Sequence, residues 1–261
     1  MNKLVVVKIG GNIIDDDEKL AAFLETFARI DGPKILVHGG GKLATRMAED
    51  LGIRQEMVDG RRITDKDTLK IVTMVYAGTI NKTIVSGLQA AGCAALGLTG
   101  ADGNALLAHK RVSAGTDYGF VGDIDRVNTD LLQSLLHLGL TLVVAPITHD
   151  GHGQLLNTNA DTIAQELATS LGRSYETSLV YSFEKAGVLL DAADDSTVIP
   201  RLTPASFRQL RETGAIYAGM LPKLQNAFIA LDSGVRQVII GKAESLSELI
   251  AGTAGTTLTH D

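Results

Sequence analysis

A lysine followed by two glycines lies near the start of the chain, where a short apolar run ends. Residues 4–7 lead directly into Lys8-Ile9-Gly10-Gly11, and a second apolar run at 35–37 leads into His38-Gly39-Gly40-Gly41. Glycine lets backbone N–H groups approach an anion that a Cβ atom would keep away, and a lysine neutralises the charge of that anion. Two such turns, one with a lysine at its entrance, predict an enzyme of phosphoryl transfer.

The common phosphate-binding patterns do not occur in this sequence. No segment provides Gly-x-Gly-x-x-Gly after an apolar run with an acidic residue about twenty positions further on. The P-loop pattern also fails, because Leu36 stands where its first glycine belongs and Leu43 where its Ser or Thr belongs. The sequence therefore predicts a phosphate cradle of another kind.

Two arginines lie in a glycine turn, 59–64, just before a predicted helix. Guanidinium groups bind carboxylates through two parallel N–H bonds, so Arg61 and Arg62 fit an anchor for an acidic metabolite. Taken alone, the turn is better explained by ordinary solvated arginines at a helix start.

Further polar residues precede two predicted helices. Asn157, Asn159 and Asp161 share one face if the segment is extended, and a helix N-cap accounts for one of them but not for all. Lys223 lies near a helix start, where the helix dipole disfavours a cation and a nucleotide phosphate would resolve the conflict. For the lysine alone, an exposed side chain reaching into water is the simpler explanation.

The histidines do not form a metal-binding pattern. His149 and His152 lie in a glycine-rich turn without a third clear ligand, so we predict loop residues and no metal site. We expect His38 to fix the glycine turn that follows it rather than to carry a proton.

Composition excludes several classes of protein. The 261 residues carry 24 basic and 30 acidic side chains, a net charge of −6, which argues against nucleic acid or an anionic membrane as partner. No stretch approaches the roughly 20 apolar residues of a membrane helix, and the first residues do not resemble a signal peptide. The single Cys93 lies among small residues, which favours a buried thiol in a reducing compartment. We therefore expect a soluble cytoplasmic protein.

Apolar runs and helical patterns alternate along the chain, which predicts an α/β fold with an open, mostly parallel central sheet sandwiched by helices. The predicted strands lie at 4–9, 34–38, 93–98, 140–146, 177–182 and 236–240. The predicted helices lie at 17–30, 41–51, 65–91, 128–138, 160–171, 203–213, 220–233 and 244–251.

The segment 101–126 departs from this alternation. Its alternating residues at 106–112 and 118–122 predict a β-hairpin beside the main sheet. We place the seam between two lobes near 171–174, which gives an N-terminal lobe of 1–172 and a C-terminal lobe of 173–261 on one continuous sheet.

These motifs together resemble the amino acid kinase superfamily, and most closely its N-acetylglutamate kinase branch, nearly from end to end. The motifs that support this resemblance are Lys-Ile-Gly-Gly, Val-His-Gly-Gly-Gly, Asp-Gly-Arg-Arg-Ile-Thr, and the segments at 78–82, 97–103, 121–128, 157–161 and 219–223. The lysine-glycine motifs are shared across the superfamily. The arginine turn and the segment 121–128 are more specific to the acylglutamate branch.

The resemblance implies an ATP-dependent enzyme that phosphorylates the side-chain carboxylate of N-acetyl-L-glutamate in the second step of arginine biosynthesis. It implies that Lys8 and Lys223 stabilise the transferring phosphoryl group, that Asp161 holds both lysines, and that Gly10 and Gly11 donate N–H groups to phosphate. The chemistry agrees, because a carboxylate nucleophile is already ionised at pH 7 and needs cations and oriented N–H groups rather than a general base.

The resemblance also implies where the two substrates bind. The acylated amino acid would contact Gly40, Gly41, Arg62, Asn157 and Asn159, with Arg62 taking its α-carboxylate. The nucleotide site would further include Glu184, Gly187, Tyr217, Gly219 and Met220. ATP with Mg²⁺ would be a co-substrate, with no tightly bound cofactor. The N-terminal half would bind the acylglutamate and form a homodimer contact, and the C-terminal half would bind ATP.

The chain departs from the family pattern at two places. Ser182-Phe183-Glu184-Lys185-Ala186-Gly187 replaces the usual Thr/Ser-Asp-Val-x-Gly segment, so that Glu184 stands for the aspartate, and Ala101 stands where lysine is common. The first strand begins at once, without the extra N-terminal helix of the arginine-inhibited hexameric members, which suggests an arginine-insensitive homodimer.

Three alternatives remain open. The same chemistry on N-succinyl-L-glutamate would need a roomier, more cationic acyl pocket. Another kinase of this fold is the second alternative: glutamate 5-kinase, aspartokinase, carbamate kinase or uridylate kinase. The arginine turn argues against the uridylate and carbamate kinases, and aspartokinases usually add long regulatory domains that this sequence does not show. A non-catalytic metabolite sensor would explain the altered segment at 182–187, but it would not need Lys8, Asp161 and Lys223.

Overall fold

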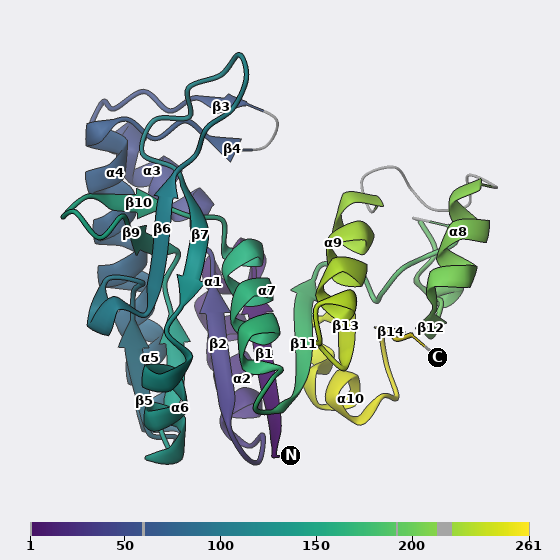
Figure 1. The fold of residues 1–261 in the computed structure, drawn as a ribbon. Coiled ribbons are helices and arrows are strands. Elements are labelled where there is room, and N and C mark those ends of the chain that lie inside the picture. The colour runs from purple at the N-terminus through teal and green to yellow at the C-terminus, as the bar shows by residue number, and fades with distance from the viewer. Residues whose placement is uncertain (1, 59–60, 192, 213–220, 261) are drawn as a thin grey trace.

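Eight strands form one sheet at the centre of the molecule. The computed structural model describes residues 2–58, 61–191, 193–212 and 221–260, with the backbone alone at 183 and 221–223. The strand order is β12-β14-β13-β11-β1-β2-β8-β5 (Figure 1). The strands are β1 (Lys3–Ile9), β2 (Lys34–His38), β5 (Ala95–Leu98), β8 (Thr141–Val144), β11 (Glu176–Phe183), β12 (Arg201–Leu202), β13 (Gln237–Lys242) and β14 (Thr256–Leu258).

The six strands from β13 to β5 run parallel, and β14 pairs with β13 in the antiparallel sense. This confirms the predicted mostly parallel sheet. The sheet takes β11 and β13 from one side of the predicted seam and β1 and β2 from the other, with β1 and β11 as direct neighbours.

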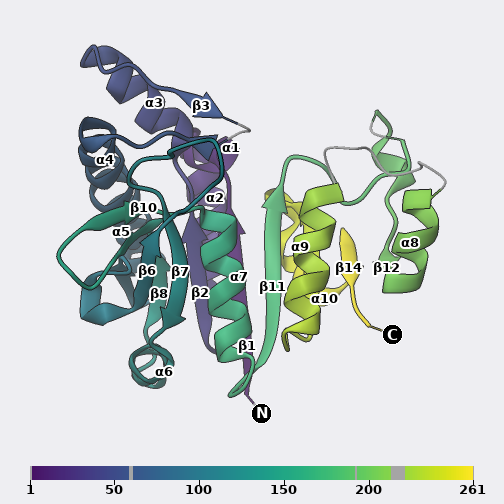
Figure 2. The ribbon, with the colours of Figure 1, turned by 45° about the horizontal axis from the view of Figure 1, so that its top comes forward.

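Helices cover both faces of the sheet, so its strands are apolar on both sides. In β1, Leu4 and Val6 pack on one side, and Val5 and Val7 on the other. The first side is covered by α6 (Thr129–His137), α7 (Ala160–Leu171), α8 (Pro204–Glu212) and α9 (Leu221–Asp232). The other side is covered by α2 (Asp17–Ala28), α5 (Asn81–Ala90) and α10 (Leu246–Ala251), as Figures 1 and 2 show.

Short helices begin at both glycine turns. Gly10 caps α1 (Gly11–Ile14) at the end of β1, and Gly40 caps α3 (Gly41–Asp50) after β2. Because β1 and β2 are parallel neighbours, with Ile9 paired to His38, the two turns lie at the same edge of the sheet. The carboxyl ends of parallel strands are where ligands bind in open α/β sheets.

A second sheet packs on the side of α7. Its order is β10-β9-β6-β7, formed by β6 (Leu106–Lys110), β7 (Gly122–Val127), β9 (Ile147–His149) and β10 (Leu155–Asn157). The predicted hairpin is present as the antiparallel pair β6–β7, but its return strand begins at Gly122 and not at Tyr118. Residues 118–121 instead join Thr64 and Asn157 through isolated bridges, so their alternation reflects contacts with other segments.

The long helix predicted at 65–91 is helical but not uniform. It consists of α4 (Lys66–Thr73), the π-helical segment η1 (Met74–Ile80) and α5. Periodicity predicted the continuous helix, and the wider turn at its centre left no sequence signal.

The remaining elements are short. They are the pair β3 (Met57–Val58) and β4 (Arg61–Arg62), and the 3₁₀ turns η2 (Asp102–Asn104), η3 (Asp195–Thr197) and η5 (Ala243–Ser245). Among the described residues, no helix is both long and apolar enough to cross a bilayer.

Candidate active site

Lys8 and Asp161 meet at the edge of the sheet where β1 ends. The alternation along β1 that turns Leu4 and Val6 toward α7 turns Lys8 the same way. Lys8 Nζ lies 2.7 Å from Asp161 Oδ1, with the side chains 18% and 39% exposed. Partly exposed ion pairs add little to stability. We therefore interpret this pair as a device that positions the ammonium group.

Asn159 fixes the backbone that carries Asp161. Its Oδ1 accepts hydrogen bonds from the N–H groups of Asp161 (2.8 Å) and Thr162 (3.1 Å), so Asn159 is the N-cap of α7. Asp161 lies in the first turn of that helix, where the helix dipole favours a carboxylate. N-capping therefore explains Asn159 but not Asn157 or Asp161, as we expected from the sequence.

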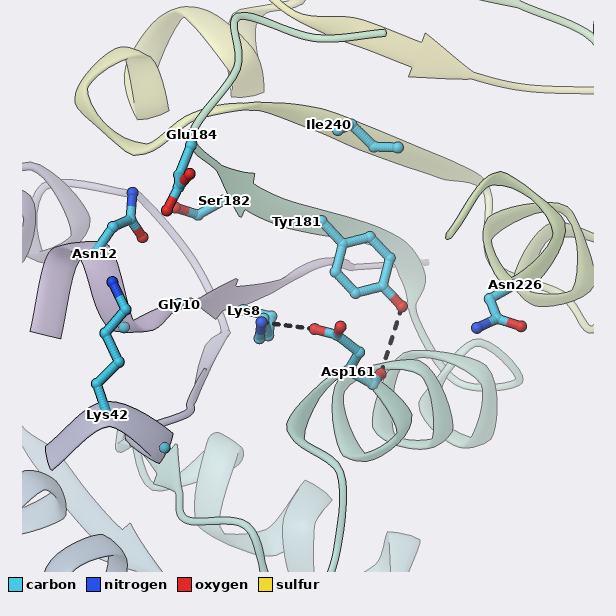
Figure 3. Close-up of a pocket in the computed structure, with 12 residues that line it drawn as sticks. Lys8, Gly10, Asn12, Lys42, Asp161, Tyr181, Ser182, Glu184, Asn226 and Ile240 are labelled. Carbon is cyan, nitrogen blue, oxygen red and sulfur yellow. Dashed lines mark hydrogen bonds and ion pairs between the residues drawn. The ribbon is translucent and has the colours of Figure 1, made fainter. Parts of the chain in front are cut away.

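Tyr181 of β11 lies beside Lys8 in register and packs on the same face. Its hydroxyl donates to the backbone oxygen of Asp161 at 3.4 Å (Figure 3). Burial raises the pKa of Tyr181, and the nearby Asp161 carboxylate adds to the rise. The phenol is therefore a neutral donor at physiological pH.

A pocket of about 400 Å³ opens beside this ion pair. Lys8, Gly10, Gly11, Asp161 and Glu184 line it, so five of the residues predicted for catalysis and nucleotide binding come together there (Figure 3). These residues lie far apart in the sequence. The pairing of β1 with β11 brings Lys8 and Glu184 to the same edge of the sheet. The pocket combines a cation and two glycines at a helix start, which suits a phosphate group.

A second pocket of about 230 Å³ adjoins the first. The predicted acylglutamate residues Gly40, Gly41, Arg62, Asn157 and Asn159 all line it. Gly41 lines both pockets, so a ligand in one lies next to a ligand in the other.

Arg62 is buried at the second pocket, with only 8% of its surface exposed. Its Nη2 donates to Gly41 O at 2.9 Å and to Thr45 Oγ1 at 2.8 Å, and its Nη1 donates to Gln55 Oε1. These acceptors are all neutral, and no ion pair of Arg62 is found within the described ranges. A buried guanidinium needs a compensating negative charge, so the pocket suits a carboxylate. The explanation as a solvated surface arginine is wrong for Arg62.

Asn157 enters the same pocket from the small sheet. Its Nδ2 donates to Thr64 Oγ1 at 3.0 Å, which ties β10 to the arginine turn. Arg62 and Asn157 are therefore held on one wall, although 95 positions separate them in sequence.

His38 is structural, in agreement with the sequence-based expectation. It is fully buried, and its Nδ1 lies 2.8 Å from Gly39 O, while Asn81 Nδ2 lies 3.3 Å from its Nε2. The neutral tautomer with the proton on Nδ1 satisfies both contacts. Burial lowers the pKa of His38 to about 4, and Lys82 opposes its protonation further.

Some predicted residues lie elsewhere or outside the described ranges. Gly187 lines neither of the two pockets. A Cβ there would meet Thr256 Oγ1 at 2.7 Å, so close packing gives a reason for glycine at this position. Tyr217, Gly219 and Met220 lie outside the described residues. Lys223 lies in α9, where the structure describes its backbone alone.

Several pocket residues were not singled out from the sequence, and three of them could contact a ligand through a polar group. Tyr76 of η1 and Arg111 line the second pocket, and Lys42 of α3 lines the first. Tyr76 is hidden inside a helical pattern, and Arg111 is neutralised by Asp123. For Lys42, the only available signal was its place directly after the glycine turn.

The fold and the paired pockets define a class of protein. A mostly parallel sheet carries a lysine-glycine phosphate turn at its carboxyl edge, next to a buried arginine pocket. This combination is that of an α/β phosphotransferase acting on a small carboxylate.

Comparison with known proteins narrows the class. The amino acid kinase family model matches residues 3–242. The chain is 55% identical to the acetylglutamate kinase of Parabacteroides distasonis, covering 95% of this chain and 97% of that protein. It is also 55% identical to the acetylglutamate kinase of Cytophaga hutchinsonii, covering 99% of each. The carbamate kinase of Giardia lamblia bound to AMP-PNP shares the fold, with a TM-score of 0.71, 13% identity, and coverage of 100% of this chain and 99% of that one.

The chain belongs to the amino acid kinase family. It is a kinase that acts on a carboxyl group, as its resemblance implied.

Proposed function

We propose that this protein transfers the γ-phosphoryl group of ATP to the side-chain carboxylate of N-acetyl-L-glutamate, the second step of arginine biosynthesis. The observation that carries the proposal is the meeting of the two pockets at Gly41. One pocket offers Lys8 and glycine N–H groups to phosphate, and the other offers the buried Arg62 to a carboxylate. The names of the relatives at 55% identity support the same substrate.

The geometry suggests how the chain would promote the reaction. Arg62 would bind the α-carboxylate and leave the side-chain carboxylate directed toward Gly41. That carboxylate is ionised at pH 7, so its oxygen attacks the γ-phosphorus without a general base while the bond to the β,γ-bridging oxygen breaks. ADP leaves and the acyl phosphate remains.

The protein would act by holding charge in place. Lys8, oriented by Asp161, and the N–H groups of Gly10 and Gly11 would stabilise the negative charge on the transferring group. By the family resemblance, Lys223 would approach the same group from the nucleotide side. Glu184 would take part in nucleotide binding from the end of β11.

Several finer properties belong to the same proposal. ATP would enter with Mg²⁺ as its counter-ion, the 1–172 lobe would hold the acylglutamate and a homodimer contact, and the 173–261 lobe would hold the nucleotide. A cytoplasmic location is supported by Cys93, which is buried and free and so suits a reducing compartment.

The test is an ATP-dependent acyl-phosphate assay that traps the product with hydroxylamine. N-acetylglutamate, N-succinylglutamate, glutamate and aspartate are compared in parallel, and we expect turnover on N-acetylglutamate. N-succinylglutamate is the second candidate, because the exposed Arg61 also lines the second pocket and an added carboxylate would suit it. Turnover on free glutamate would move the protein to another branch of the family.

The Lys8→Ala variant tests whether the protein catalyses phosphoryl transfer or only binds its ligands. Loss of this contact should lower turnover about a hundredfold or more, since one charge contact in a transition state contributes roughly 3 kcal/mol. A variant that keeps turnover within a fewfold of wild type would contradict the mechanism. A folded wild type that is silent on all four acceptors would favour a metabolite sensor instead.

A further inference from the structure

We propose that Lys42 is a further phosphate-binding residue of the active site, which contacts the polyphosphate of ATP. This inference rests on the proposed function, since it names an additional contact in the same site. It concerns the first residue after the second glycine turn, for which neither the motifs nor the resemblance assigned a role.

The position of Lys42 is set by both glycine turns. It is the second residue of α3, directly after Gly41, and its side chain lines the 400 Å³ pocket together with Lys8. A Cβ atom built on Gly11 would lie 3.9 Å from Lys42 Cδ, so the lysine stem crosses close to the first glycine turn. In Figure 3 its ammonium group extends from α3 toward Asn12 of α1.

Lys42 is an exposed residue, so water solvates its ammonium group. Its ammonium lies within ion-pair distance of no described carboxylate, although Asp161 and Glu184 line the same pocket. Asp15 also lies next to Gly11, with Oδ2 3.1 Å from a Cβ built there, but Asp15 pairs with Arg46 at 3.6 Å. The first turn of a helix is also where the dipole disfavours a cation. An anion in the pocket would offset this unfavourable dipole and give the ammonium group a charged partner.

Lys42 would therefore complete a cradle with one cation from each glycine turn. Lys8 comes from the turn after β1, and Lys42 from the turn after β2, which lies beside it in the sheet. Two cations converging from neighbouring turns offset the repulsion between a polyphosphate and a carboxylate that must approach each other.

The experiment measures ATP affinity by calorimetry and the KM for both substrates in wild type, Lys42→Ala, Lys42→Arg and Lys66→Ala. Lys66 is the matched control, an exposed lysine in the first turn of α4 that lines neither pocket. Lys42→Ala should weaken ATP binding about ten- to hundredfold, as expected for a charge-assisted hydrogen bond. Lys42→Arg should recover most of the affinity, and the KM for N-acetylglutamate should stay unchanged.

Unchanged ATP affinity in Lys42→Ala would overturn the inference. So would an equal loss in Glu184→Gln with no further loss in the double variant, because Lys42 would then act through a contact with Glu184. A wild type that binds ATP but phosphorylates no acceptor would defeat the proposed function and leave the ATP titration to decide Lys42. A wild type that binds no ATP would end both proposals.

Discussion

At the residue scale, two glycines of the phosphate turns have different physical reasons to be glycine. Gly40 has φ +148°, and a Cβ there would lie 2.2 Å from Ile80 Cδ1. Gly10 has an ordinary extended backbone, φ −98° and ψ 178°, and the nearest atom to its Cβ would be Asn12 Oδ1 at 3.3 Å. The protein itself requires glycine at position 40, whereas at position 10 the requirement comes from whatever occupies the pocket.

Alanine substitutions at these two sites should therefore separate stability from activity. Gly40→Ala combines a strained backbone with overpacking and should lower the free energy of unfolding by about 2–4 kcal/mol. Gly10→Ala should leave that free energy within about 0.5 kcal/mol of wild type but lower kcat at least about tenfold. Urea unfolding and the hydroxamate assay measure the two effects. A fully active Gly10→Ala would contradict the phosphate-contact role.

His38 makes the stability of the protein depend on pH. Burial lowers its pKa from the ordinary 6.5 to about 4, so the unfolded chain takes up a proton that the folded chain refuses. Stability is therefore fully present above about pH 6.5 and is lost as the pH falls toward 4, by on the order of 3 kcal/mol in all.

Urea unfolding between pH 4 and pH 7 tests this contribution. Acidic residues also titrate in that range, so the comparison is with His38→Asn, which lacks the ionisable ring. The wild type should lose more stability than the variant as the pH falls. Parallel curves would show that His38 does not cause the pH dependence.

At the scale of elements, the N-terminus of α7 links folding to chemistry. Asn159 caps the helix, and Asp161 in its first turn orients Lys8. Loss of the cap would free the two N–H groups that it binds and release the turn that carries the carboxylate. The same residues thus serve the helix and the site.

Asn159→Ala should cost about 1 kcal/mol of stability and also lower kcat. The matched control is Asn128→Ala, which removes the N-cap of α6, a helix whose residues line neither pocket. The control should lose similar stability, since its Oδ1 accepts from Leu131 N at 3.2 Å, and keep wild-type kcat. Equal effects of the two variants on kcat would contradict a special role for the α7 cap.

A π-helical segment positions the second pocket. Within η1, Tyr76 lies at the pocket and its ring carbons would contact a Gly40 Cβ at 3.1 and 3.2 Å. Segments of π-helix are rare and occur often at functional sites. Tyr76 and Ile80, both in this segment, lie against Gly40 of the glycine turn, and Tyr76 also lines the pocket.

At the scale of the whole molecule, the two predicted lobes share one sheet and one core. The hydrophobic cluster on the α7 side contains Leu4 and Ile35 from the first half and Val238 and Leu258 from the second. Because β1 and β11 also pair directly, backbone hydrogen bonds of the sheet join the two halves in addition to the shared hydrophobic cluster.

We therefore expect one cooperative unfolding transition. Urea curves followed by far-UV circular dichroism and by tyrosine fluorescence should coincide. Leu258→Ala, a cavity at the far end of the sheet, should shift both curves equally, by about 2–5 kcal/mol. Separate transitions, or a shift in one probe alone, would mean that the lobes unfold independently.

The sequence alone determined the elements and much of the chemistry. Helix 160–171 and strand 34–38 were predicted with the observed bounds, and the lysine-glycine turn marked the phosphate side of the site. These features depend on neighbours within a few positions, on the periodicity of apolar residues and on the special conformations of glycine. Such local causes can be read along a single chain.

Only the tertiary structure decided which side chains meet. It distinguished the buried Arg62 from the exposed Arg61, joined Asn157 to the arginine turn, moved the return strand of the hairpin to Gly122, and brought Lys42 into the phosphate pocket. The physical reason is that burial and pocket geometry arise from contacts between residues far apart in the chain, and no local pattern records them.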